Sequence, residues 1–161
     1  MPLEITIQRF DEGDLADVLE LVRNTIDISY RPDYSAEVIA FFKQFHTRQS
    51  ILDDARNGYI VVASVGGEIA GTGTLLGAYI RRVFISPSHQ RRGIGTLIAA
   101  DLERRAAADG RKVLDLSSAL GSRTFWESQG YSVREEHFAP APNDLIIHYY
   151  TMEKILLGGT V

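Results

Sequence analysis

The 161-residue sequence contains no cysteine, one tryptophan and two methionines. Without cysteine the chain has no disulfide, no thiolate metal site and no cysteine nucleophile. No apolar run approaches the roughly 18 residues that a membrane-spanning helix needs. The first residues, Met1-Pro2-Leu3-Glu4, lack the basic region and apolar stretch of a secretory signal. We therefore expect a cytoplasmic protein that does not contact a membrane.

Histidine is also scarce, and the four histidines show no metal-ligand spacing, so no metal is expected. The formal net charge of −4 argues against a polyanion as the main partner. Arginines nevertheless gather locally, in a positive patch at Arg81, Arg82, Arg91 and Arg92. Arg91 and Arg92, beside a glycine turn, are expected to neutralise phosphates, whereas the role of Arg81 and Arg82 stays open. Because no aromatic platform for stacking bases accompanies these arginines, a nucleic acid is not expected as the partner.

Strand and helix patterns alternate along the chain without a linker or repeat, which indicates one α/β domain over residues 1–161. Strands are expected at 5–7, 59–65, 69–76, 79–85, 113–116, 131–138 and 146–155. Helices are expected at 11–28, 35–45, 94–108 and 122–129, with Phe45 on the buried face of the second. The turn at Gly66-Gly67 predicts an antiparallel hairpin, whereas the helix 94–108 between two strands predicts a parallel crossover. The sheet should be mixed, and an exposed last strand could pair with a second copy in a homodimer.

The segment 83–96 is the most informative part of the sequence, because it combines a strand, a turn stopped by Pro87 and the start of a helix. Two glycines, Gly93 and Gly95, let the backbone approach an anion closely. The free N–H groups and the positive end of the helix dipole point at that anion. The segment therefore predicts a diphosphate site.

Known phosphate sites differ in detail from this segment. A nucleotide P-loop needs lysine followed by serine or threonine after its last glycine, but Gly95 is followed by Thr96-Leu97. A dinucleotide fingerprint needs a third glycine or an alanine where Ile98 stands. A purely structural role, in which the glycines only join a strand to a helix, remains open at this point.

The stretch Gln90-Arg91-Arg92-Gly93-Ile94-Gly95 resembles the acyl-CoA signature of the GNAT superfamily of N-acetyltransferases, Gln/Arg-x-x-Gly-x-Gly/Ala, at every fixed position. The resemblance extends to the two early helices, the strand with Gly71 and Gly73, and the final strand. Residues 125–131 are similar to the family's Phe-Tyr-Glu-x-x-Gly-Phe/Tyr. The resemblance as a whole implies a GNAT-like fold: a mixed, mostly antiparallel sheet with a splayed parallel strand pair and flanking helices.

The resemblance implies that acetyl-CoA is the co-substrate. The main chain of Val83, Phe84 and Ile85 should pair with the pantetheine arm as an added strand would. The amides from Arg91 through Thr96 should hold the pyrophosphate, with room made by Gly93 and Gly95. The expected cofactor-binding residues are therefore Val83, Phe84, Ile85, Gln90, Arg91, Arg92, Gly93, Ile94, Gly95, Thr96 and Trp126, the last packing against the acyl end.

The implied reaction is direct transfer of the acetyl group from the thioester to a primary amine in a ternary complex, with a main-chain N–H near a strand bulge stabilising the oxyanion. The family's usual glutamate positions are occupied by Tyr79 and Leu114, and its usual tyrosine by Trp126. Ala119 replaces a frequent asparagine. Tyr79, acting through water, and Asp115 are the remaining candidates for catalysis.

The acceptor is expected to be a small-molecule or peptide amine that binds near Tyr30, Arg31 and Tyr34, at the break between the two early helices. Because all the usual acid and base positions differ, a second class stays open: a catalytically weak acyl-CoA-binding sensor or interaction module. Turnover against an amine panel separates the two classes.

Overall fold

Seven strands form one sheet in the computed structural model, which describes residues 4–156. The strand order is β1-β2-β3-β4-β5-β7-β6, and every neighbouring pair is antiparallel except β4 and β5, which are parallel. The strands are β1 (Ile5–Arg9), β2 (Tyr59–Val65), β3 (Glu68–Leu76), β4 (Tyr79–Ile85), β5 (Val113–Ser118), β6 (Ser132–Ala141) and β7 (Leu145–Ile155). The predicted mixed, mostly antiparallel sheet with one parallel pair is confirmed.

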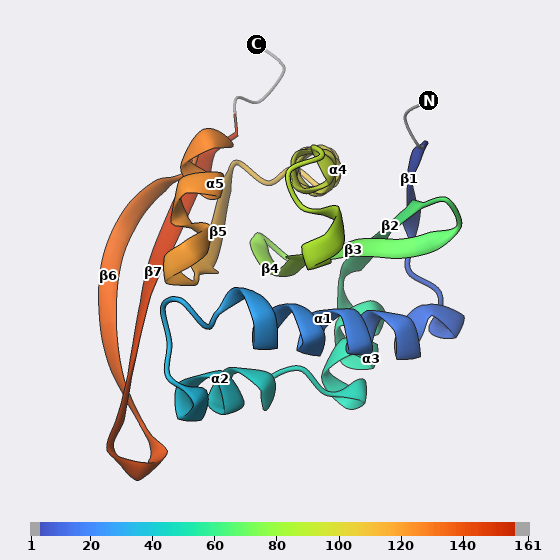
Figure 1. The fold of residues 1–161 in the computed structure, drawn as a ribbon. Coiled ribbons are helices and arrows are strands. Elements are labelled where there is room, and N and C mark those ends of the chain that lie inside the picture. The colour runs from blue at the N-terminus through green and yellow to red at the C-terminus, as the bar shows by residue number, and fades with distance from the viewer. Residues whose placement is uncertain (1–3, 157–161) are drawn as a thin grey trace.

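Five α-helices cover the two faces of this sheet. They are α1 (Leu15–Ser29), α2 (Ala36–Lys43), α3 (Arg48–Asn57), α4 (Ile94–Ala108) and α5 (Arg123–Ser128). Figure 1 shows α1, α2 and α3 on one face and α4 and α5 on the other. Among the described residues, none of the helices combines the length and apolarity needed to cross a bilayer.

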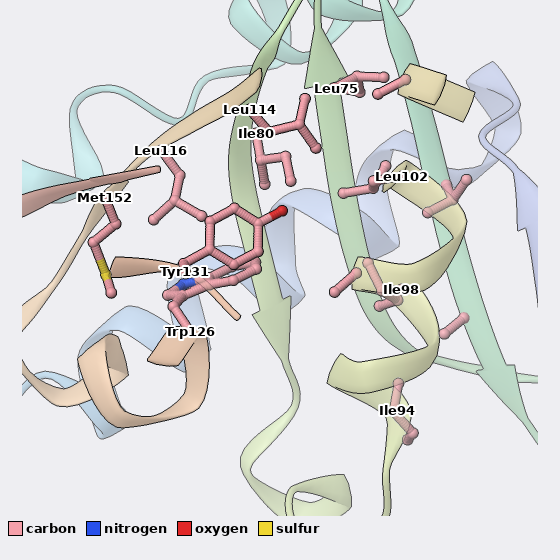
Figure 2. Packing of buried hydrophobic residues seen from close by; sticks show 14 of the residues in the cluster. Leu75, Ile80, Ile94, Ile98, Leu102, Leu114, Leu116, Trp126, Tyr131 and Met152 are labelled. Atoms are coloured by element: carbon pink, nitrogen blue, oxygen red, sulfur yellow. The ribbon is translucent and has the colours of Figure 1, made fainter. Parts of the chain in front are cut away.

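Each face of the sheet has its own hydrophobic core. On the α4 side, Ile94, Ile98 and Leu102 pack over the sheet with Leu116 and Trp126, as Figure 2 shows. On the other side the core includes Val22 and Ile26 of α1, Ile51 of α3 and Phe84 of β4. The two cores hold α1 and α4 in place on either side of β4.

The glycines of β3 allow α4 to lie close to the sheet. A Cβ atom built on Gly73 would lie 2.5 Å from Cγ2 of Ile98, and one on Gly71 would lie 3.1 Å from Cδ1 of Ile98 and 2.8 Å from Cδ1 of Ile85 in β4. Distances this short would force the neighbouring side chains to move. The position of α4, and with it the position of the loop before α4, therefore depends on these two glycines.

The helices of the N-terminal half differ from the sequence prediction at three places. The predicted helix 11–28 begins with a separate 3₁₀ turn, η1 (Glu12–Asp14), which Asp11 caps. Helix α3 was not predicted, since its residues are mostly polar. Phe45 is 52% exposed because α2 ends at Lys43, before that residue.

The last strand of the chain is not at an edge. β7 lies between β5 and β6, so the exposed edges are β1 and β6, and the predicted pairing of the last strand with a second copy is wrong. β6 also extends further than predicted, to Ala141, although Pro140 lies within it. A proline fits there because an edge strand has N–H positions that need no partner.

Candidate functional site

A cavity of about 650 Å³ opens beside the C-terminal half of β4. The end of α1 forms one wall, and α5 with the short turn η3 (Leu120–Ser122) forms the opposite wall. The first turn of α4 closes one end. Every residue expected to bind the cofactor lines this cavity except Arg92. The folded chain thus gathers one continuous segment, 83–96, and the distant Trp126 around a single space.

The edge of β4 that faces β5 is open along the cavity. β4 pairs with β5 only at Tyr79↔Asp115 and Ile80↔Leu116. Beyond Ile80 the two strands diverge, so the main chain of Val83, Phe84 and Ile85 has no strand partner on that side among the described residues. An open strand edge binds an extended ligand through its N–H and C=O groups.

The N-terminus of α4 has no capping side chain. Its N-cap is Gly93, with a φ of 83°, and no side chain accepts a hydrogen bond from the first N–H groups. By contrast, Ser35 caps α2 and Thr47 caps α3 through their hydroxyl oxygens. The uncapped donors of α4, on Ile94, Gly95 and Thr96, face the cavity together with the positive end of the helix dipole. This arrangement suits a diphosphate.

The loop between β4 and α4 is held in shape by Gln90. Its amide Nε2 donates to the carbonyl oxygen of Ile85 at 3.0 Å and to the hydroxyl of Ser29 at 3.3 Å. Arg91, next in the chain, has a φ of 65°. Gln90 thus connects the end of β4 and the end of α1, and it also lines the cavity.

The two glycines of the loop have different roles. Gly93 adopts the left-handed conformation, in which a side chain is strained. A Cβ atom on Gly95, however, would lie 3.0 Å from the ring of Phe125. The space beside Gly95 therefore accommodates Phe125 of α5, whereas the sequence suggested that it made room for the phosphates. Trp126 is 5% exposed and packs against Phe125 and Tyr131 while also lining the cavity.

The four arginines do not form one patch. Arg91 and Arg92 are exposed beside the cavity. Arg81 and Arg82 instead form ion pairs with Asp54 of α3, at 3.3 and 2.6 Å, and Arg82 is buried. The predicted positive patch is thus limited to Arg91 and Arg92, because Arg82 is buried and Asp54 pairs with both Arg81 and Arg82.

The catalytic candidates Tyr79 and Asp115 lie outside the cavity lining. They face each other in the short parallel pair, before the strands diverge. The hydroxyl of Tyr79 donates to Oγ of Ser117 at 2.8 Å, and Asp115 forms an ion pair with Arg134 at 3.2 Å. In this structure both groups are engaged with protein neighbours.

Of the expected acceptor residues, Tyr30 lines the cavity, whereas Arg31 and Tyr34 line a neighbouring groove on the α2 side. Tyr30 packs against Tyr34, Phe42 and Phe84, with ring centroids 5.2 to 6.4 Å apart. Burial, and to a smaller extent Tyr34, raises the pKa of Tyr30 well above its usual value. The phenol therefore stays protonated at neutral pH and can donate a hydrogen bond but cannot act as a base.

A larger cavity, of about 870 Å³, lies between β1, the β2–β3 turn and α1. Its charged lining residues are carboxylates: Glu4, Asp14, Asp17, Glu20 and Glu68. Their negative charge would repel a diphosphate, so size alone does not identify the nucleotide site. No group of three or more histidine, aspartate and glutamate side chains that could hold a metal occurs within residues 4–156.

Sequence reasoning missed Thr25 and Ser29, the α1 residues that line the cavity. Their spacing of four residues places them on one helix face, but nothing in the sequence indicates which element that face meets. Sequence reasoning also missed the cluster of Arg82, Asp54 and His46. The capping sequence from Thr47 to Ser50 could have indicated the start of helix α3, which carries Asp54.

Comparison with known proteins shows the family of the chain and the relatives of its fold. The family described as the acetyltransferase (GNAT) domain matches residues 30–154, most of the chain. No curated protein matches the chain by sequence. Solved structures do resemble it in fold, at low sequence identity.

A GCN5-related N-acetyltransferase from Rhodopseudomonas palustris superposes with a TM-score of 0.87 at 20% identity, covering 97% of this chain and 98% of the other. The PaiA N-acetyltransferase from Thermoplasma acidophilum, solved in complex with coenzyme A, gives 0.76 at 16% identity and covers 95% and 99%. A ribosomal-protein-alanine N-acetyltransferase from Brucella melitensis gives 0.74 at 19% identity and covers 94% and 99%.

Proposed function

Because the chain belongs to the GNAT acetyltransferase family, we propose that it transfers the acetyl group of acetyl-CoA to a primary amine by direct attack within a ternary complex. The observation that carries the proposal is the uncapped N-terminus of α4, with its N–H donors facing a cavity bounded by the open edge of β4. A related fold has been solved with coenzyme A bound.

The residues present fit acetyl-CoA in three ways. The N–H groups from Arg91 to Thr96, with the exposed guanidinium of Arg91, match the charge and size of a pyrophosphate. The unpaired main chain of Val83 and Ile85 matches a pantetheine arm, which carries amide donors and acceptors. Trp126 offers an apolar wall for the acyl end.

In the reaction, the amine nitrogen attacks the thioester carbonyl carbon, an amide forms, the carbon–sulfur bond breaks and the thiolate takes up a proton. The chain's own contribution is to align the two reactants and to exclude water from the cavity. A main-chain N–H of β4 beside the open edge stabilises the negative charge that develops on the carbonyl oxygen.

The proton that the amine loses needs a route out of the site. Tyr79 and Asp115 remain our candidates, acting through water, because neither side chain lines the cavity. Tyr30 is excluded as the base by its raised pKa, and we assign it with Arg31 and Tyr34 to binding of a small-molecule or peptide acceptor. We place the reaction in the cytoplasm.

Two measurements on the purified protein test the proposal. Calorimetry with coenzyme A at low ionic strength should give a saturable heat, and absence of binding would refute the acetyl-CoA site. Release of free thiol from acetyl-CoA, followed across a panel of primary amines, should identify an acceptor that accelerates it. Binding without turnover against every amine would instead favour a sensor or interaction module.

A further inference from the structure

β4 contains a bulge at the place where it leaves β5. In the pairing with β3, Thr72 faces Phe84 and Thr74 faces Arg81, so Gly73 alone faces both Arg82 and Val83. Arg82 has a φ of 55°, a conformation that a residue with a side chain seldom adopts. The parallel pairing with β5 ends at Ile80, two residues before Arg82.

The side chain of Arg82 is held from α3 and from the turn before it. Its Nη1 donates to Oδ2 of Asp54 at 2.6 Å, its Nε to Nδ1 of His46 at 3.0 Å and its Nη2 to Oγ of Ser50 at 3.3 Å. Only 1% of the Arg82 side chain and 9% of the Asp54 side chain are exposed. Arg81 adds a second ion pair to the same carboxylate oxygen, at 3.3 Å.

The partners of Arg82 are themselves fixed. Ser50 belongs to the cap of α3, where it exchanges hydrogen bonds with Thr47. The ring of His46 packs edge-on against Phe84, with centroids 5.5 Å apart. Phe84 is both a neighbour of the bulge and a lining residue of the cavity. The buried cluster therefore touches the strand segment that forms the open edge, from the face opposite α4 and α5.

We propose that Arg82 is a positioning residue for acetyl transfer: together with Asp54 and His46 it holds the bulge of β4, so that the open-edge main-chain groups of Val83 and Ile85 face the thioester. Arg82 does not line the cavity and acts only through the shape of the backbone. This inference rests on the proposed function, since the geometry matters for catalysis only if a thioester binds along β4.

The substitution Asp54→Asn tests the inference, because asparagine keeps an oxygen that accepts a hydrogen bond and removes the charge. At saturating acetyl-CoA we expect kcat to fall by about 10- to 100-fold, the penalty of a misplaced reacting group. The dissociation constant for coenzyme A should rise by a clearly smaller factor than kcat falls, since the pantetheine arm pairs with Val83 and Ile85 but the phosphates bind at Gly93 to Thr96, away from the bulge. Arg82→Lys, which keeps the positive charge but not the planar guanidinium group, should lose less activity than Arg82→Met.

Glu103→Gln is the matched control. Glu103 of α4 accepts from Lys154 at 2.8 Å and from the hydroxyl of Tyr131 at 2.9 Å, and it is also mostly buried, but it does not line the cavity. The control should lower the melting temperature and leave kcat unchanged. An equal loss of kcat in Asp54→Asn and Glu103→Gln, or a parallel loss of kcat and coenzyme A affinity in Asp54→Asn, would overturn the positioning role.

Amide hydrogen exchange separates a failure of this inference from a failure of the proposed function. In Asp54→Asn the amide of Phe84, which pairs with Thr72 of β3 beside the bulge, should exchange about tenfold faster or more, while those of Gly95 and Thr96 keep their wild-type rates. Unchanged exchange at Phe84 would refute the positioning role of Arg82 even if the wild-type protein acetylated no amine. Inactive wild-type protein with the expected exchange pattern would refute the proposed function alone.

Discussion

The hydroxyl of Tyr34 donates a hydrogen bond to the carbonyl oxygen of His148, 2.7 Å away, and accepts one from the main-chain N–H of Leu120 at 3.0 Å. One side chain thus ties the segment between α1 and α2 to β7 and to the turn after β5. These three elements lie on the two sides of the gap that opens between β4 and β5. Burial, only partly opposed by the bond from Leu120, raises the pKa of Tyr34 to about 12.

The substitution Tyr34→Phe should therefore loosen the acceptor side of the site. It leaves the Leu120 N–H and the His148 carbonyl unpaired, a loss of about 1–3 kcal/mol in the free energy of unfolding. The KM for the acceptor amine should rise more than the KM for acetyl-CoA. Tyr59→Phe is the control, since the Tyr59 hydroxyl donates to Asp101 at 2.7 Å, away from the cavity. Equal effects of both variants on the acceptor KM would contradict the assignment of Tyr34.

Gly93 and Gly110 provide a matched pair for testing the loop before α4. They flank the same helix, have φ values of 83° and 81°, and have no atom within 4 Å of a built Cβ. Alanine at either position should lower the free energy of unfolding by about 1 kcal/mol, the penalty of a left-handed conformation. Only Gly93→Ala should also weaken coenzyme A binding. Urea denaturation and calorimetry report the two effects, and equal coenzyme A affinity in the two variants would contradict the site.

His46 should make the protein less stable in mild acid. Burial, and then the charges of Arg82, Arg81 and Arg23, lower the pKa of His46 to about 3. Below the ordinary pKa of about 6.5 the unfolded chain therefore binds a proton that the native protein does not, so stability falls as the pH falls. Between pH 7.5 and pH 5 this loss amounts to about 2 kcal/mol.

Urea denaturation at several pH values between 7.5 and 5 measures that loss. In His46→Gln the glutamine side chain can still accept the hydrogen bond from Arg82 but does not titrate, so its stability should depend less on pH. A variant with the same pH dependence as the wild-type protein would show that His46 is not the group responsible.

Arg91 should contribute to cofactor binding through its charge. Replacing it by glutamine removes a charge-assisted contact to phosphate, which should weaken coenzyme A binding by about tenfold at low salt. The affinity of the variant should also decline less steeply with added salt than that of the wild-type protein. Arg111→Gln, at an exposed position outside the cavity lining, is the control. Calorimetry at two salt concentrations distinguishes this expectation from a general effect of net charge.

The sequence predicted the elements around the loop well because their signals are local. β4 and α4 have the predicted bounds of 79–85 and 94–108. Pro87 ends the strand, and glycines with positive φ lie before and after the helix. The helix between the strands at Val83 and Val113 also predicted the parallel crossover, which the pairing of β4 with β5 confirms, whereas the position of β7 between β5 and β6 was not predicted.

The buried cluster at Arg82 could not be predicted in the same way. Arg82 and Asp54 are 28 positions apart, and a charged residue in a sequence normally indicates solvent. Their burial depends on α3, whose apolar positions are too few to indicate an amphipathic helix. The role of Gly95 was likewise hidden, because it depends on contact with Phe125 from a distant helix.

An amide NMR titration of the isotope-labelled protein with coenzyme A tests the central claim most directly, since it observes the main-chain donors themselves. The largest, saturable shifts should occur at Gly93, Ile94, Gly95 and Thr96, with a second set at Val83 to Ile85. Saturable shifts confined to other residues, for example those around the acidic cavity beside β1, would contradict the claim that the N-terminus of α4 holds the diphosphate.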